Sequence, residues 1–293
     1  MSQPVLIVDV FAERPLEGNP LAVFPDAGGL SDGRMQALAR EMNFSETTFI
    51  TGREADGSWR VRIFTPATEL PFAGHPTLGT AWVIRNFVVD DGPPLVTLSL
   101  KVGNVPVRFE PAEDGADPLP WLTAPEVTLG ATVAPERMAR ALRIDAGDVD
   151  LGSPIQLATV GLTTLIVPLR GQEALRRCRP DVDAFMELER EGIPFQVYVF
   201  CREPRDRSHH ARARFFFDAN GVREDPATGS ATAAFGQYLL EHRLFGEEFS
   251  LRIEQGYEIK RPSLLRLRGR RVGESCEIRV GGRVVPVLRG ELV

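Results

Sequence analysis

The sequence predicts an α+β protein of two pseudo-symmetric lobes, each with a sheet or barrel wrapped around a buried central helix. Two stretches carry this prediction, because each is long enough for a helix and contains no charged residue. They are residues 70–84 (after Glu69) and residues 226–240 (after Asp225). A surface helix normally shows a charged face, so helices without one are expected to be buried.

The two lobes are predicted to descend from an internal duplication, because four segments recur in the same order about 150 residues apart. Similar sequences in a conserved order indicate two copies of one fold unit. The pairs are residues 74–77 with 229–232, 60–64 with 212–216, 45–50 with 195–200, and 20–25 with 163–168.

The other expected elements follow from hydrophobic patterning along the chain. A helix is expected to begin at Ser31-Asp32 and to end at Asn43, because Met35, Leu38, Ala39 and Met42 are spaced at helical intervals. Amphipathic helices are also expected at residues 134–142 and 181–191. Runs rich in β-branched and aromatic residues predict strands. These runs are residues 5–11, 21–24, 45–51, 59–64, 96–107 (two strands), 162–168, 195–200, 249–254, 263–268, 276–280 and 283–288.

Proline- and glycine-bearing sequence near the middle of the chain predicts the domain boundaries. We expect a first lobe at residues 1–118, a crossover linker at 119–133 and a second lobe at 134–280. Residues 281–293 are expected to form a C-terminal strand that returns to the first lobe.

Composition narrows the class of protein and its partners. A net charge of −6 and a pI near 5.4 argue against nucleic acid as the main partner. Cys178, Cys201 and Cys276 are few, odd in number and widely spaced, which favours a reducing compartment without a disulfide framework. The sequence shows no signal-peptide pattern and no apolar run of about 18 residues, so we expect a cytoplasmic protein without a membrane partner.

The beginnings of the two uncharged helices are candidate anion sites. A helix N-terminus presents backbone N–H groups and the positive end of a dipole, so Gly74, Gly229 and Ser230 are expected to bind a small carboxylate. His75 and Asp225 flank these ends, and Pro76 suits the first helical position. Alternatively, Thr228 or Ser230 could be an ordinary helix cap, and His75 could be one as well.

Glu46 is a further candidate for acid–base chemistry, because it opens a strand in the otherwise uncharged residues 42–50. A surface residue at a strand end is the alternative. A carboxylate and an imidazole in a shielded cleft between the lobes could have pKa values suited to proton transfer. The sequence lacks a dinucleotide-binding motif, a phosphate loop and Cys or His pairs at metal-ligand spacing. We therefore expect proton transfer without a cofactor or a metal.

Several motifs in this order resemble the PhzF family over nearly the whole chain. They are residues 18–20, 43–47, 74–79, 224–231, 255–256, 261–263 and 280–285. The resemblance implies a fold similar to diaminopimelate epimerase, with an active site between the lobes, and homodimers. It implies that Glu46 is the acid/base and that His75, Asp225 and Ser230 complete the site. Asn19 and Ser45, which lie in matching motifs, are expected to bind substrate.

The predicted function is that of a cofactor-independent isomerase acting on a small carboxylate-bearing metabolite. Characterised phenazine-pathway members of the family isomerise trans-2,3-dihydro-3-hydroxyanthranilate, and the resemblance implies similar chemistry here. Two alternatives remain open. One is a two-base epimerase or racemase of an amino or hydroxy acid, with Glu46 and Asp225 on opposite faces of one carbon. The other is a non-catalytic protein that binds small carboxylates.

Overall fold

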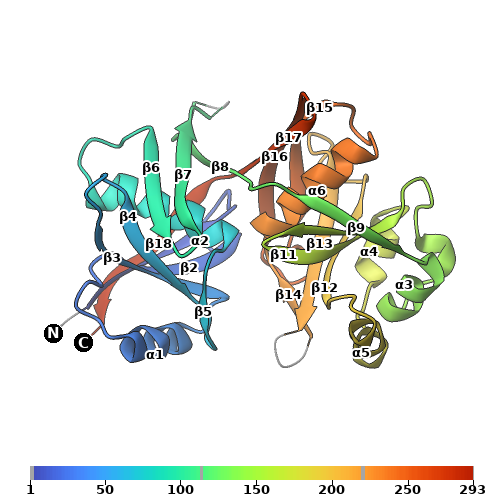
Figure 1. The fold of residues 1–293 in the computed structure, drawn as a ribbon, viewed down its shortest axis with the longest axis horizontal. Coiled ribbons are helices and arrows are strands. Elements are labelled where there is room, and N and C mark those ends of the chain that lie inside the picture. The colour runs from blue at the N-terminus through green and yellow to red at the C-terminus, as the bar shows by residue number, and fades with distance from the viewer. Residues whose placement is uncertain (1–2, 113–114, 219–221, 293) are drawn as a thin grey trace. The chain divides into compact units, whose positions relative to one another are not determined.

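The computed structural model describes residues 3–112, 115–218 and 222–292, and the fold is mixed α+β as predicted (Figure 1). Contacts between residues divide the chain into two compact units. Unit 1 comprises Met1–Thr123 together with Gly281–Val293, and unit 2 comprises Ala124–Val280. The predicted linker at residues 119–133 consists largely of two strands, β8 (Leu119–Thr123) in unit 1 and β9 (Thr128–Val133) in unit 2.

Unit 1 contains nine strands, two α-helices and a short π-helical extension within its described residues. The remaining bounds are β1 (Gln3–Val10), β2 (Asn19–Phe24), α1 (Asp32–Met42), β3 (Glu46–Arg53), β4 (Trp59–Phe64), β5 (Glu69–Leu70), α2 (Gly74–Val83), η1 (Ile84–Val88), β6 (Leu95–Leu100), β7 (Gly103–Glu110) and β18 (Val284–Leu292).

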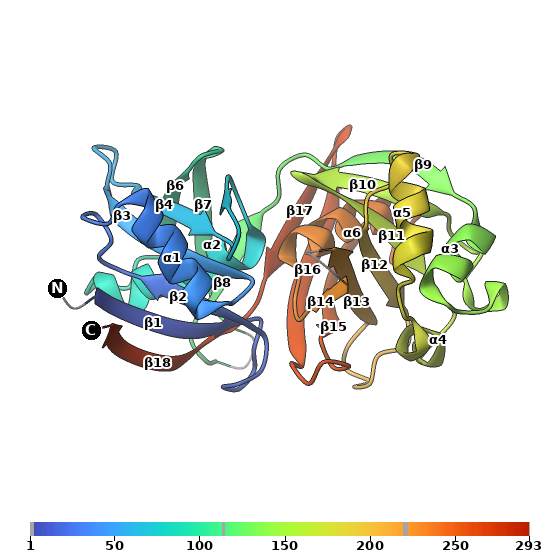
Figure 2. The ribbon, with the colours of Figure 1, turned by 90° about the horizontal axis from the view of Figure 1, so that it is seen from below.

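The sheet of unit 1 runs in the order β18, β1, β2, β3, β4, β6, β7, β8. The pairs β2–β3 and β4–β6 are parallel, and the others are antiparallel. Figure 2 shows the C-terminal β18 lying beside β1, as their pairing requires. The C-terminal strand thus lies in the first unit.

Helix α2 is surrounded by this sheet, because it contacts β1, β2, β3, β6, β7, β8 and β18. All ten of its residues are buried, which matches the absence of charge in its sequence. Gly79 allows the close approach: a Cβ there would lie 2.6 Å from a Leu21 methyl carbon and 2.8 Å from one of Val10. The helix begins at Gly74, so Pro76 is its third residue and not its first, which corrects the sequence-based expectation.

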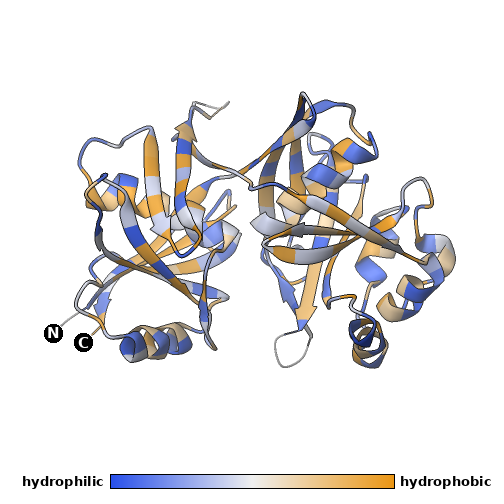
Figure 3. Ribbon diagram, viewed as in Figure 1, coloured by the Kyte–Doolittle hydropathy of each residue, from blue (hydrophilic) through white to orange (hydrophobic). Residues whose placement is uncertain are grey.

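Helix α1 lies on the outside of unit 1 and has both hydrophilic and hydrophobic residues (Figure 3). Its ends are those predicted. The Ser31 hydroxyl accepts a hydrogen bond from Arg34 N, and Asn43 adopts a left-handed conformation (φ 52°) at the C-terminal end. Its buried side chains pack with Phe24 and Phe49, whose rings stack at a centroid distance of 4.9 Å.

Unit 2 has counterparts of most elements of unit 1, but its first strand, β9, corresponds to β18, which comes last in unit 1. The bounds of its other elements are α3 (Pro135–Leu142), η2 (Ala146–Asp148), β10 (Ile155–Val160), β11 (Leu162–Pro168), α4 (Gln172–Arg177), α5 (Val182–Arg190), β12 (Gln196–Cys201), β13 (Ala211–Asp218), β14 (Val222–Asp225), α6 (Gly229–Glu241), β15 (Glu248–Gln255), β16 (Ser263–Val272) and β17 (Ser275–Gly281).

The pairing in unit 2 repeats that of unit 1 in the order β9, β10, β11, β12, β13, β15, β16. Here β11–β12 and β13–β15 are the parallel pairs. The registers also correspond: Phe49 pairs with Phe24 and Arg62, and Val199 pairs with Val167 and Arg214. These are the residues that the predicted repeats align. The shared topology is what a duplication would produce, and the duplication itself stays a prediction.

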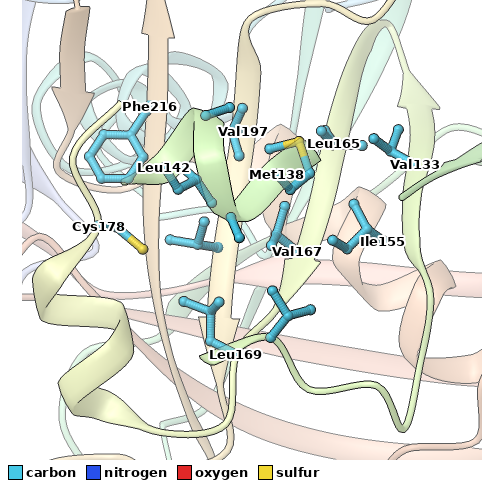
Figure 4. Packing of buried hydrophobic residues seen from close by; sticks show 14 of the residues in the cluster. Val133, Met138, Leu142, Ile155, Leu165, Val167, Leu169, Cys178, Val197 and Phe216 are labelled. Carbon is cyan, nitrogen blue, oxygen red and sulfur yellow. The ribbon is translucent and has the colours of Figure 1, made fainter. Parts of the chain in front are cut away.

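Helix α6 takes the place of α2 in unit 2, where it contacts β9, β10, β11 and β16. On the side of the sheet away from α6, a hydrophobic core lies between the strands and α3 (Figure 4). Met138 of α3 faces Leu165 and Val167 of β11, and Leu142 lies near Phe216. Thus the sheet of unit 2 is covered on one face by α6, which is uncharged up to its terminal Glu241, and on the other by amphipathic helices.

Candidate active site

Unit 1 brings three of the predicted site residues together, although they are far apart in sequence. Strands β2 and β3 are parallel, and their first residues are Asn19 and Glu46. Helix α2 begins nearby and carries His75 as its second residue. The Asn19 amide Nδ2 lies 3.3 Å from His75 Nδ1, and Glu46 Oε2 lies 3.4 Å from His75 Nε2. The imidazole therefore lies between an amide and a carboxylate.

Burial determines the charge of His75. Its side chain is only 6% exposed, and this desolvation lowers its pKa from 6.5 to about 3. The imidazole is therefore neutral at neutral pH, so we treat its contact with Glu46 as one between a carboxylate and a neutral ring. With Asn19 Nδ2 as donor, His75 Nδ1 is the acceptor and the ring proton is on Nε2, facing Glu46.

The hydrogen bonding of His75 Nε2 indicates a binding place for a small molecule. His75 Nε2 is buried and forms no hydrogen bond of good geometry with any described residue. Buried polar atoms are normally satisfied, so such an atom indicates a place where a ligand or water would bind. Glu46 is 17% exposed and so is accessible from outside. A carboxylate next to a neutral, buried imidazole can exchange a proton with a bound molecule.

Gly74 and Ser45 are adjacent in sequence to these residues. Gly74 is the first residue of α2, and the N-cap residue Ala73 has no side chain that could cap the helix. The Thr77 hydroxyl instead donates to Ala73 O at 2.7 Å. The role of this helix end as an anion site stays a prediction, and Ser45 immediately precedes β3.

Unit 2 brings together the other predicted residues at the beginning of α6. Asp225 ends β14 and is 8% exposed, while Gly229 and Ser230 are the first two residues of the helix. Thr228 occupies the N-cap position, but its side chain does not cap the helix. Its hydroxyl donates to Asp225 Oδ2 at 2.5 Å, which corrects the expectation of an ordinary cap.

Sequence reasoning assigned no role in the site to two residues that hold the unit 2 cluster in place. Gln255, at the end of β15, is fully buried and hydrogen-bonds to the turn between Asp225 and Thr228. Arg214 forms two hydrogen bonds, of 3.0 and 2.7 Å, with the carboxylate of Glu224, the residue before Asp225. The two repeats carry an arginine at the same position, Arg62 and Arg214, and this recurrence could have identified Arg214 from the sequence.

Among the described residues, no group of three or more His, Cys, Asp or Glu side chains could hold a metal ion. Among the same residues, no helix combines the length and apolarity that a membrane span requires.

Comparison with known proteins identifies the family. Residues 8–290 match the family described as phenazine biosynthesis-like protein, PhzC-PhzF. The chain therefore belongs to the PhzF family, as its motifs predicted. A trans-2,3-dihydro-3-hydroxyanthranilate isomerase from Pseudomonas aeruginosa is 37% identical over 269 residues, which cover 92% of this chain and 91% of the relative.

Solved structures agree with this assignment. A PhzF-family phenazine biosynthesis protein from Bacillus anthracis superposes with a TM-score of 0.92 at 27% identity, covering 100% of this chain and 99% of the other. A protein described as a predicted epimerase, from Pseudomonas aeruginosa, has a TM-score of 0.83 at 35% identity, covering 99% of both chains. The predicted fold class is confirmed, and the predicted isomerase class agrees with the name of the curated relative.

Proposed function

We propose that this protein is a PhzF-type isomerase that moves a proton within a small carboxylate-bearing metabolite by general acid–base catalysis. The observation that supports it most strongly is the Glu46–His75–Asn19 cluster in a member of this family. Glu46 is the proposed acid/base, and the neutral His75 would donate a hydrogen bond through Nε2 to a bound substrate. The proposal requires no cofactor or metal ion.

Asp225 is the proposed second acid–base group, and the first residues of both uncharged helices are the proposed carboxylate sites. Backbone N–H groups at Gly74, Gly229 and Ser230 would stabilise negative charge on the substrate. Asn19 and Ser45 are proposed to contact the substrate. That both clusters serve one substrate stays a prediction, as do the homodimer and the cytoplasmic location.

The substrate of the curated relative is the first compound to test. The protein is incubated with trans-2,3-dihydro-3-hydroxyanthranilate in deuterium oxide, and the product is followed by NMR. We expect isomerisation with solvent deuterium entering the product or the recovered substrate. Glu46→Gln should reduce the rate by about 10²- to 10⁴-fold, the usual contribution of a general acid–base group. Near wild-type turnover by this variant would contradict the assignment of Glu46.

Glu41→Gln is the matched control, because Glu41 is an exposed glutamate near the end of α1. It should leave the rate unchanged. If the wild-type protein does not act on this compound, related cyclic and aromatic carboxylates are tested in the same exchange assay. Tight binding of such a compound without exchange or conversion would favour the non-catalytic binding protein.

An epimerase is the second candidate, because one structural neighbour of 35% identity is described as a predicted epimerase. In this case Glu46 and Asp225 would act on opposite faces of one carbon, and the carbon skeleton would be retained. Chiral chromatography of amino and hydroxy acids after incubation distinguishes the two functions. Racemisation of a single enantiomer would favour the epimerase, and a shifted double bond would favour the isomerase.

A further inference from the structure

We propose that Gln255 is a positioning residue for Asp225: it directs the Thr228 hydroxyl so that this hydroxyl donates to the Asp225 carboxylate. The inference rests on the proposed function only for the acid–base role of Asp225. The hydrogen bonds that carry it all lie within unit 2, at the turn that connects β14 to α6.

Two backbone groups determine the orientation of the Gln255 amide. The carbonyl oxygen of Asp225 can only accept, and it lies 2.9 Å from Gln255 Nε2. The backbone N–H of Thr228 can only donate, and it lies 3.3 Å from Gln255 Oε1. Both contacts require the same orientation of the amide, so its oxygen and nitrogen are assigned by chemistry.

The oriented amide in turn determines the direction of the Thr228 hydroxyl. Gln255 Nε2 also lies 3.1 Å from Thr228 Oγ1, and an amide nitrogen can only donate. Thr228 Oγ1 is therefore the acceptor in that contact. Its single proton is left for Asp225 Oδ2, at 2.5 Å. A hydrogen bond donated to a carboxylate favours its ionised form.

The surrounding backbone keeps this arrangement in place. Gln255 is fully buried, and the next residue, Gly256, has φ +79°. A Cβ at Gly256 would lie only 2.6 Å from Pro226 O, so the end of β15 directly contacts the turn. The turn and the strand end are thus held at a fixed distance, which Gln255 spans.

The charged residues next to this network are bonded elsewhere. Glu224, before Asp225, is paired with Arg214. Glu254, before Gln255, accepts hydrogen bonds from the backbone N–H groups of Arg205 and Asp206 and contacts His209 Nδ1 at 2.8 Å. Substitutions at Thr228 and Gln255 therefore change the hydrogen bonding of Asp225 without removing a charge from the turn.

The kinetic test compares Thr228→Val, Thr228→Ser and Gln255→Leu, none of which changes the charge of the turn. Valine has the shape of threonine but cannot donate, while leucine is close in size to glutamine but lacks its Nε2 donor. Both should lower kcat by about 10- to 100-fold with little change in KM, as expected for a lost hydrogen bond to a charged group. Thr228→Ser should retain most of the activity. Combining Thr228→Val with Gln255→Leu should lower kcat little more than Thr228→Val alone, because Gln255 is proposed to act on the Asp225 carboxylate through the Thr228 hydroxyl.

Thr164→Val is the matched control, since Thr164 is a buried threonine on β11 of the same unit, and it should leave kcat unchanged. Additive losses in the double variant, or full activity in Thr228→Val, would overturn the proposal.

A second measurement does not depend on any substrate. The NMR signal of the Asp225 carboxyl carbon is assigned by its disappearance in Asp225→Asn. The pKa of this carboxyl group is then measured in each variant from the pH dependence of the signal. This pKa should be higher in Thr228→Val and Gln255→Leu than in the wild type and Thr228→Ser. An unchanged pKa in both would overturn the inference. A raised pKa in a protein that turns over no substrate would support the inference while contradicting the proposed function.

Discussion

At the scale of single residues, the charge state of His75 links stability to the chemistry of the site. Its imidazole is buried between Asn19 and Glu46, and burial lowers its pKa to about 3. An exposed histidine titrates near 6.5. The ring therefore stays neutral well below the pH at which an exposed histidine becomes charged.

The first prediction at this scale is a pH dependence of stability. Between pH 6.5 and 3 the unfolded chain binds a proton at His75 that the folded chain does not. The free energy of unfolding should therefore fall as the pH is lowered through this range, by up to about 1.4 kcal/mol per pH unit from this residue. Above pH 6.5 the titration of His75 should not change the free energy of unfolding. Below pH 3 this contribution to stability should be lost completely.

Urea unfolding of the wild type and His75→Gln at several pH values tests this prediction. The carboxyl groups titrate in both proteins, so the difference between the two curves isolates His75. We expect the stability of the wild type relative to the variant to decline as the pH falls from 6.5. Parallel curves would show that His75 is not buried in its neutral form.

At the scale of elements, each unit holds the segment before its uncharged helix with a corresponding Arg–Glu pair. Arg62 on β4 binds Glu69 on β5 through two hydrogen bonds of 2.8 Å, and it holds the pKa of Glu69 down at about 2. Arg214 on β13 binds Glu224 on β14 in the same bidentate way. Phe64 pairs with Glu69 and Phe216 with Glu224, so the registers agree.

The two pairs should differ in their effect on stability, because they differ in exposure. The Arg214 side chain is 4% exposed and Glu224 9%, whereas Arg62 is 26% exposed. Arg214 also donates to the carbonyl oxygens of Leu175 and Cys178. Arg214→Met should therefore lower the free energy of unfolding by about 3–5 kcal/mol, the cost of leaving a buried partner unpaired.

Arg62→Met is the matched variant and should cost clearly less, since water can replace part of its pairing. Chemical unfolding of both variants measures the difference. An equal or larger loss from Arg62→Met would contradict the argument from burial.

At the scale of the whole molecule, the two units differ in the part of the chain that supplies one strand of each sheet. Unit 1 takes its last strand, β18, from the C-terminus, while the corresponding strand of unit 2, β9, precedes the rest of that unit. Unit 1 is therefore complete only when residues 284–292 have been synthesised.

Deleting residues 284–293 should expose the edge of β1 and destabilise unit 1 selectively. Hydrogen exchange measures this, and we expect amides of β1 and β2 to lose protection more than those of β11 and β12. Deleting only residues 291–293 is the control, because most pairing with β1 remains. Unchanged protection of β1 in the longer deletion would contradict this role of β18.

Local patterns were sufficient to predict much of the fold. The caps at Ser31 and Asn43, the strand at Trp59–Phe64 and the burial of α2 follow from chemistry within a few residues, so they could be predicted without a structure. The composition of the uncharged helices already required that other elements surround them.

The sequence by itself thus determined the fold class, the family and the candidate residues. Tertiary structure decided what those residues do to one another. Thr228 has a cap residue's sequence position, but its hydroxyl is directed by Gln255, 27 residues away, toward Asp225. His75 could have been a cap, but its partner Asn19 lies 56 residues away and its pKa depends on burial. Hydrogen-bond direction and desolvation arise from groups brought together by folding, and local sequence does not contain them.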